Sequence, residues 1–279
     1  VKLTGLAQEQ RAFLAAHDSD PFVRWDSGQT YAAEAMLAQI ATGAAGLDEG
    51  VARAFAATLA GADADPAFAA EALRLPSESL LADRMAVVDV DAIHATRQAW
   101  RAALGRRFEG ELRASYHRLS DAGPYGIDGA AIGRRALRNA CLGYLAVAGD
   151  TELASAQYRD AGNMTDTLAA LVTLAAGAAP ARMAALADFH AKWRDDPLVL
   201  DQWFALQAAS PRPDTLAVVR GLARHPDFDL RNPNRARALF GSFANANPVH
   251  FHAASGEGYR LLADAIIAID ALNGAAAAR

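Results

Sequence analysis

Histidine is the side chain best suited to proton transfer and metal binding near neutral pH. The chain has seven, which are His17, His94, His117, His190, His225, His250 and His252. A common catalytic zinc site needs two histidines one helical turn apart with a glutamate between them, so that both rings reach one ion. No two of these histidines stand four residues apart, and we predict no metal site in this chain. His250 and His252 would diverge on a helix, which favours packing or capping roles for them.

Other residue patterns that could support catalysis are weak. The paired carboxylates Asp195 and Asp196 precede Pro197, a position typical of helix capping. The sequence contains no glycine-rich phosphate loop and no Gly-x-Ser-x-Gly nucleophile turn. Trp193 and Trp203 flank the Asp195–Pro197 turn, and packing between successive helices is favoured over a ligand-stacking pair. These patterns indicate no reaction.

Two arginines form the more informative set. Arg235 and Arg237 follow Asn232-Pro233-Asn234, where Asn232 is expected to cap a helix that begins at Pro233. The two guanidinium groups could face a cavity and bind carboxylates of a substrate. Pairing inside the chain, with Asp227, Asp229 or a neighbouring carbonyl, is an equally open interpretation.

The elements that must position these residues are helices. Alanine, leucine, arginine and glutamate dominate, and Val87–Val90 is the main short β-branched run. The hydrophobic spacing predicts one long helix from Asp91 to Leu119, bent at Gly105 or Gly110. Further helices are predicted at about 5–17, 27–42, 48–59, 68–75, 128–149, 151–161, 165–176, 181–193, 198–209, 214–223 and 258–272.

Short helices separated by regular breaks are typical of stacked helical hairpins. We therefore predict an all-α fold, an α-α superhelix of the ARM/HEAT-like solenoid class without a significant sheet. The high alanine content predicts close approach of helix axes. An irregular helical bundle is the competing architecture. No linker rich in proline, glycine or serine divides the chain, so we expect one domain over residues 1–279.

The 279 residues are 52% hydrophobic and 21% charged, with a net charge of −5. This balance argues against a nucleic-acid partner, and Arg106-Arg107 and Arg134-Arg135 are expected on solvated helix faces. No run reaches the roughly 18 apolar residues of a membrane span, so no membrane partner is expected. The single cysteine, Cys141, lies in an apolar run and predicts a buried thiol. It fits a reducing compartment, and we expect a cytoplasmic location.

Several stretches, in order along nearly the whole chain, are similar to a known family. They are Pro21–Trp25 with Gly28-Gln29, Arg134–Leu142, Asn163–Asp166 with Leu168–Leu171, Lys192-Trp193 with Asp201–Phe204, Gln207-Ala208 with Ser210-Pro211, and Asn232–Arg235 through Phe251-His252 to Gly258-Tyr259. Together they resemble the C-terminal helical domain of bacterial aminopeptidase N, a zinc peptidase of the gluzincin type.

The resemblance implies that the chain is a C-terminal fragment, with a zinc-bearing catalytic domain upstream and several final helices missing. Its partners would then be that catalytic domain and the peptide substrates. The fragment itself would hold no cofactor and hydrolyse nothing. In the family, the helix after the last turn presents a glutamine and, four residues later, an arginine to the catalytic cavity. Arg279 matches the arginine, whereas Ala275 stands at the glutamine position.

Arg235, Arg237 and Arg279 are accordingly the candidates for a substrate channel, with no catalytic or metal-binding residue expected. A free-standing helical-repeat scaffold that binds a peptide or protein is the alternative function. Such a scaffold needs polar capping helices at both ends, because an uncapped array exposes a core face. The run Leu272–Arg279 resembles a helix in progress more than a finished cap.

Overall fold

A computed structural model describes residues 5–120, 125–177, 180–272 and 274. Within these ranges the regular elements are all helices. The second helix begins at Pro21, capped by Asp20, and not at residue 27 as predicted. Asp20, Asp48, Asp65, Asp89, Asp128 and Asp196 each accept hydrogen bonds from backbone N–H groups of a first helical turn. Such caps satisfy donors that a helix leaves unpaired at its start.

The chain divides into two compact units, residues 1–170 and 171–279. The helices of the first unit are α1 (Gln8–His17), α2 (Pro21–Thr42), α3 (Glu49–Ala60), α4 (Pro66–Ala72), α5 (Glu78–Ala82), α6 (Val90–Arg107), α7 (Glu109–Arg118), α8 (Gly129–Ala148) and α9 (Glu152–Asp160). Helix α10 (Met164–Ala176) runs across the boundary between the units.

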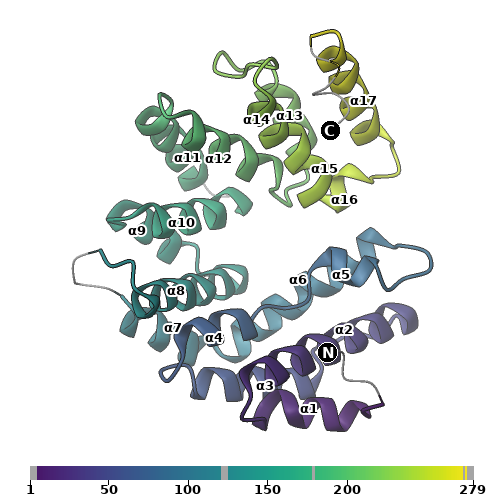
Figure 1. Cartoon of the computed structure of the whole chain (residues 1–279), viewed down its shortest axis with the longest axis vertical. Helices are drawn as coiled ribbons and strands as arrows, with labels where there is room; N and C mark the ends of the chain where they lie inside the picture. Colours follow the sequence, from purple (N-terminus) through teal and green to yellow (C-terminus); the bar gives the residue numbers. More distant parts are fainter. Residues whose placement is uncertain (1–4, 121–124, 178–179, 273, 275–279) are drawn as a thin grey trace. The chain divides into compact units, whose positions relative to one another are not determined.

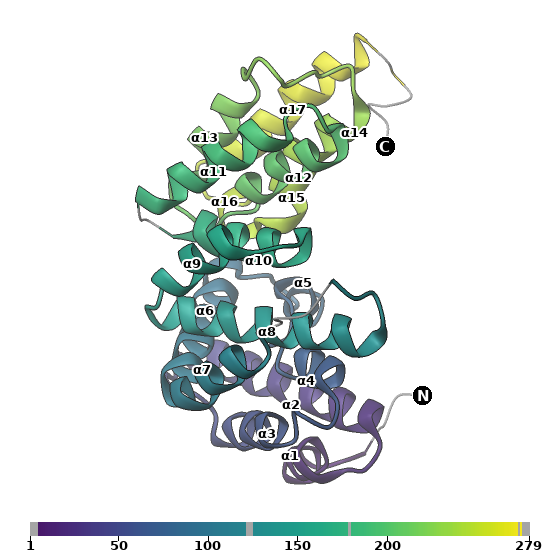
Figure 2. The same cartoon turned by 90° about the vertical axis from the view of Figure 1, so that its left-hand side faces the viewer.

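Helix α8 is the centre of the first unit, where it packs against α4, α6 and α7, and α1 lies beside α2 and α3 (Figures 1 and 2). Trp100 of α6 donates from Nε1 to Gln39 Oε1 of α2 at 2.9 Å. The hydroxyl of Tyr144 in α8 donates to the carbonyl of Leu73 at 2.5 Å. These hydrogen bonds join segments that are far apart in the sequence.

The predicted helix from Asp91 to Leu119 is two helices, because α6 ends at Arg107 and α7 begins at Glu109. Phe108 between them leaves the helical region, with φ −114° and ψ 26°. Its ring is buried and stacks on Phe55 at a centroid distance of 5.2 Å. The break is therefore set by a tertiary contact of Phe108 and not by Gly105 or Gly110.

The second unit contains α11 (Pro180–Trp193), α12 (Pro197–Ala208), α13 (Thr215–Leu222), α14 (Pro233–Ala236), the π-helix η1 (Arg237–Gly241), α15 (Ser242–Ala246), α16 (Pro248–Phe251) and α17 (Glu257–Asp270). Helix α12 is central and contacts α11, α13, α14, η1 and α15 (Figure 1). Phe189, Phe204 and Phe243 are fully buried in this unit.

Cys141 is buried in α8, as predicted, and burial raises the pKa of its thiol to about 12. Arg135, expected on a solvated face, is instead only 5% exposed. Arg107 lies on the surface, where it forms a two-bond ion pair with Glu49.

In the part of the chain that the structure describes, no helix combines the length and the hydropathy that a membrane crossing requires.

Candidate functional site

The residues from Asn232 to Gly241 form a compact junction in the second unit. Asn232 Oδ1 accepts hydrogen bonds from the N–H groups of Asn234 and Arg235 at 3.0 and 3.3 Å. Pro233 occupies the first position of α14, as predicted. The helix then continues into η1, a π-helix of five residues. Short π segments inside helices are frequent at functional sites, because they redirect the side chains that follow.

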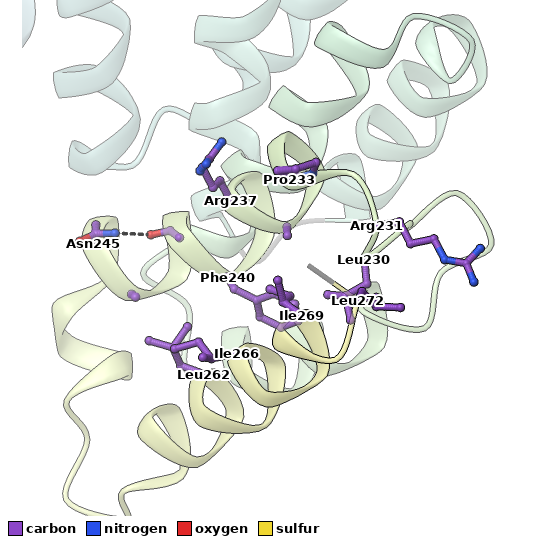
Figure 3. Close-up of a pocket in the computed structure, with 13 residues that line it drawn as sticks. Leu230, Arg231, Pro233, Arg237, Phe240, Asn245, Leu262, Ile266, Ile269 and Leu272 are labelled. Carbon is purple, nitrogen blue, oxygen red and sulfur yellow. Dashed lines mark hydrogen bonds between the residues drawn. The ribbon is translucent and has the colours of Figure 1, made fainter. Parts of the chain in front are cut away.

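Beside this junction lies an open groove of about 430 Å³ between η1 and α17 (Figure 3). Apolar side chains from both sides form its floor, and they include Leu230, Phe240, Leu262, Ile266, Ile269 and Leu272. Arg231 and Arg237 contribute the charged lining, and Figure 3 shows them on two sides of the apolar floor. We call this cavity the η1–α17 groove.

Arg237 is exposed at the η1–α17 groove. Its Nη1 lies 3.5 Å from Asn234 Oδ1, and among the described residues no carboxylate forms an ion pair with it. Its guanidinium is therefore available to an anionic group of a ligand. Arg279, the other candidate for a substrate channel, lies outside the described residues.

Arg235 is held inside the chain. It is buried, and it forms an ion pair with Asp201 of α12 through Nε. Its Nη1 donates to the backbone carbonyl of Asp227. The guanidinium also stacks over the ring of Phe204, 5.0 Å from the centroid. Arg235 thus joins three parts of the unit, and its acid partner is Asp201 rather than the expected Asp227 or Asp229 side chains.

Next to Arg235 lies a cluster that spacing in the sequence does not reveal. Nε2 of His190 donates to Oδ2 of Asp227 at 2.7 Å, and Nη2 of Arg194 donates to Oδ1 at 3.1 Å. The N–H of Asp227 donates to Nδ1 of His225 at 3.1 Å. His190 lies in α11, and Asp227 lies in the segment between α13 and α14, 37 residues further along the chain, so no local pattern could predict the contact.

Electrostatics in this cluster favour a neutral His225 and an ionised Asp227. Burial lowers the pKa of His225, and the neighbouring His190 lowers it further against the opposing effect of Asp227. Burial alone would raise the pKa of Asp227. The hydrogen bond from His190 and the nearby charge of Arg194 outweigh it and lower that pKa.

Possible ligand atoms of His190, His225 and Asp227 lie within 4.8 Å of one another. The set fits a zinc ion poorly, because both oxygens of Asp227 already accept hydrogen bonds from His190 and Arg194. Nδ1 of His225 is also engaged, by the N–H of Asp227. The guanidinium of Arg194 would in addition repel a cation. We interpret the cluster as a structural network that orders the turn before α14.

The other residues that the sequence offered as site candidates can be placed in the structure. Asp196 caps α12. Trp203 is buried and donates to the carbonyl of Leu186 at 2.9 Å, whereas Trp193 is 37% exposed. Nδ1 of His252 lies 2.6 Å from the hydroxyl of Tyr259. Among its described lining residues, the η1–α17 groove holds no nucleophile and no acid–base pair. Its chemistry is that of binding, with an apolar floor and arginine charges.

Comparison with known proteins identifies the family of this chain. The family model described as "Domain of unknown function (DUF3458_C) ARM repeats" matches residues 8–279. The chain belongs to this family. Because all regular elements in the described ranges are helices and the family consists of ARM repeats, the prediction of an all-α helical-repeat fold is confirmed.

The relatives include aminopeptidase N of Caulobacter vibrioides, which is 41% identical over 99% of this chain and 32% of its own length. Aminopeptidase N of Escherichia coli is 39% identical over 98% of this chain and 32% of its own length. A crystal structure of Legionella pneumophila aminopeptidase A in complex with aspartic acid has a TM-score of 0.88 at 29% identity. It is matched over 99% of this chain and 34% of the Legionella chain. The chain therefore spans about a third of the length of these relatives.

Proposed function

We propose that the chain is the C-terminal helical domain of a zinc-dependent aminopeptidase N. The observation that carries the proposal is the 41% identity to aminopeptidase N of Caulobacter vibrioides, sustained over 99% of the chain. The parent enzyme removes N-terminal residues from peptides in the cytoplasm. Its zinc lies in an upstream catalytic domain of the same polypeptide, and the present chain supplies no cofactor ligand.

The role of the helical domain is to cover the active site and to shape the route by which peptides reach it. A wall of helices can orient a bound peptide and exclude water from the reaction. A narrow route also excludes folded chains and admits free N-terminal segments. Support comes from the groove chemistry, since the lining described above can bind a ligand but has no groups for hydrolysis.

Within this role, Arg237 and Arg279 are proposed to face the substrate route. Arg237 is exposed and has no ion pair among the described residues, so it can bind a carboxylate of a passing peptide. Arg235 acts as a positioning residue, because its ion pair with Asp201 anchors the segment that carries Arg237. The family resemblance is what supports Arg279 as a residue of this route.

A reconstitution experiment tests the proposal. The upstream two-thirds of the Caulobacter enzyme would be produced separately and mixed with this chain, and cleavage of an aminoacyl-anilide and of a longer peptide would be measured. We expect no turnover by this chain with zinc alone, and faster peptide cleavage by the mixture than by the upstream part. Arg237→Met should lower kcat/KM of the mixture for the peptide by about tenfold, the loss of one charged hydrogen bond.

Turnover by this chain alone would overturn the proposal. So would the absence of any association or rate change in the mixture, since the chain would then have no enzyme domain to cover.

A further inference from the structure

A second cavity lies in the first unit, where the segment before α8, α8 itself and the turn between α9 and α10 meet. Its volume is about 260 Å³. Two of the stretches singled out in the sequence, Arg134–Leu142 and Asn163–Asp166, come together at this cavity. The proposed function makes no use of them. We call the cavity the α8–α10 cavity.

One side of the α8–α10 cavity is a network of hydrogen bonds around Asp166 and Arg138, in which Nε of Arg138 is left without a partner. Oδ2 of Asp166 accepts from Arg138 Nη1 at 3.2 Å and from Asn163 Nδ2 at 3.0 Å. Oδ1 of Asp166 accepts from Asn139 Nδ2 at 2.9 Å. Nη2 of Arg138 donates to the hydroxyl of Tyr116 at 3.1 Å. The charges of Arg138 and Asp166 therefore compensate each other and are unavailable to a further partner.

The charge of Arg135, in contrast to that of Arg138, is not compensated by an acidic partner among the described residues. Arg135 lines the same cavity and is only 5% exposed. Its Nε has no hydrogen-bond partner, and no carboxylate among the described residues forms an ion pair with it. The ring of Tyr125 covers the guanidinium, whose central carbon lies 4.6 Å from the ring centroid. A buried cation without a counter-charge is costly, and such groups are ordinarily paired.

We propose that the α8–α10 cavity binds a small organic monocarboxylate, whose carboxylate group pairs with Arg135. The planar guanidinium presents parallel N–H donors that match the two oxygens of a carboxylate. The cavity volume exceeds what the carboxylate alone fills, so an organic group of a few carbon atoms can lie in the remaining space. Tyr125 supplies an apolar ring at one side.

The sign and size of the ligand charge follow from the lining. Asp160 is exposed at the cavity, and Asp166 lies on its wall. The carboxylate of Asp160 repels each further negative charge of a ligand, whereas that of Asp166 is compensated by Arg138. A singly charged carboxylate is therefore preferred over phosphate, although both could engage a guanidinium. A preference for the monocarboxylate over phosphate distinguishes a specific binding site from non-specific attraction of anions.

Isothermal titration of the 279-residue chain with sodium propionate and with sodium phosphate, at constant ionic strength, tests the inference. We expect saturable binding of propionate and at least tenfold weaker binding of phosphate. Arg135→Met should weaken propionate binding at least tenfold. Arg159→Met, which removes an exposed arginine of the neighbouring α9, is the matched control and should bind like the unaltered chain.

A second measurement does not depend on the stability of the Arg135→Met variant. In ¹⁵N NMR spectra of the unaltered chain, the Nε–H resonance of Arg135, assigned by its loss in Arg135→Lys, should shift saturably with propionate. An unmoved resonance, or phosphate binding as tight as propionate, would overturn the proposal.

Asp121 precedes the cavity segment in the sequence and lies outside the described residues. Propionate binding by an Asp121→Asn variant but not by the unaltered chain would also overturn the proposal, because Asp121 would then be the partner of Arg135.

Discussion

Arginine side chains in this chain have different roles, because their surroundings differ. Arg235 has a carboxylate, a backbone carbonyl and an aromatic ring around its guanidinium. Arg237, two residues later, is exposed at the η1–α17 groove. Neighbouring residues on a helix point in different directions, so one arginine enters the unit and the other faces solvent. Structural and ligand-binding roles are thereby divided between them.

Replacing Arg235 by methionine leaves the largely buried carboxylate of Asp201 without its cation. Removing one partner of a buried ion pair is strongly destabilising, so the free energy of unfolding should fall by about 3 kcal/mol. Urea denaturation followed by circular dichroism measures this change. Arg237→Met, at an exposed position, should change the same quantity by less than about 0.5 kcal/mol. Equal effects of the two substitutions would contradict the division of roles.

At the scale of elements, α8 is positioned by glycine and alanine at the points of closest approach. A Cβ atom added to Gly105 of α6 would overlap the carbonyl oxygen of Tyr144 in α8. At Gly133 of α8, an added Cβ would lie 3.1 Å from the Cβ of Ala67 in α4. Small residues at these positions let the helix axes come close, as the high alanine content predicts. Larger side chains would separate α8 from the helices around it.

Gly105→Ala should therefore lower the free energy of unfolding by about 2–3 kcal/mol, since the clash involves the backbone of α8 and no side chain can move away. Gly110→Ala is the matched control. Gly110 lies in α7, has no atom near the added Cβ and is exposed. That substitution should raise the free energy of unfolding by about 0.5–1 kcal/mol, because alanine loses less conformational entropy in a helix. Thermal or urea denaturation of both variants measures the contrast, and destabilisation by both would refute the packing argument.

At the scale of the whole molecule, each unit has its own apolar centre. Trp100, Leu104 and Leu142 are buried in the first unit, and Phe189, Phe204 and Phe243 in the second. A chain of 279 residues can bury enough apolar surface to fold without a metal ion. The polar cluster around Asp227 is satisfied by hydrogen bonds from its own neighbours. We therefore expect both units to be stable without a structural ion.

Removal of metal should accordingly leave the stability unchanged. The midpoint of thermal unfolding of the purified chain should be the same with and without excess EDTA. A structural ion contributes directly to folding, so its loss would lower the midpoint by several degrees. Such a drop, if abolished by His190→Gln, would show that the cluster of His190, His225 and Asp227 holds a metal ion.

The sequence by itself determined the features that depend on neighbouring residues. Helix starts at Asp128, Asp196 and Asn232, the buried thiol of Cys141 and the all-helical class all follow from local capping and hydrophobic spacing. The family resemblance could also be recognised from the sequence, because its stretches keep their order along the chain. The aminopeptidase N relatives, which match 98–99% of the chain, confirm it.

Tertiary structure alone decided where the long helix breaks and which polar side chains are buried. The helix break at Phe108 depends on a stacking contact with Phe55. The burial of Arg135 and the pairing of Arg235 with Asp201 depend on helices far away in the sequence. Such contacts have no signature in local spacing, since the energy of a charge or ring depends on its partners in space. Capping, in contrast, is a contact between residues two or three positions apart, so the order of residues along the chain is enough to predict it.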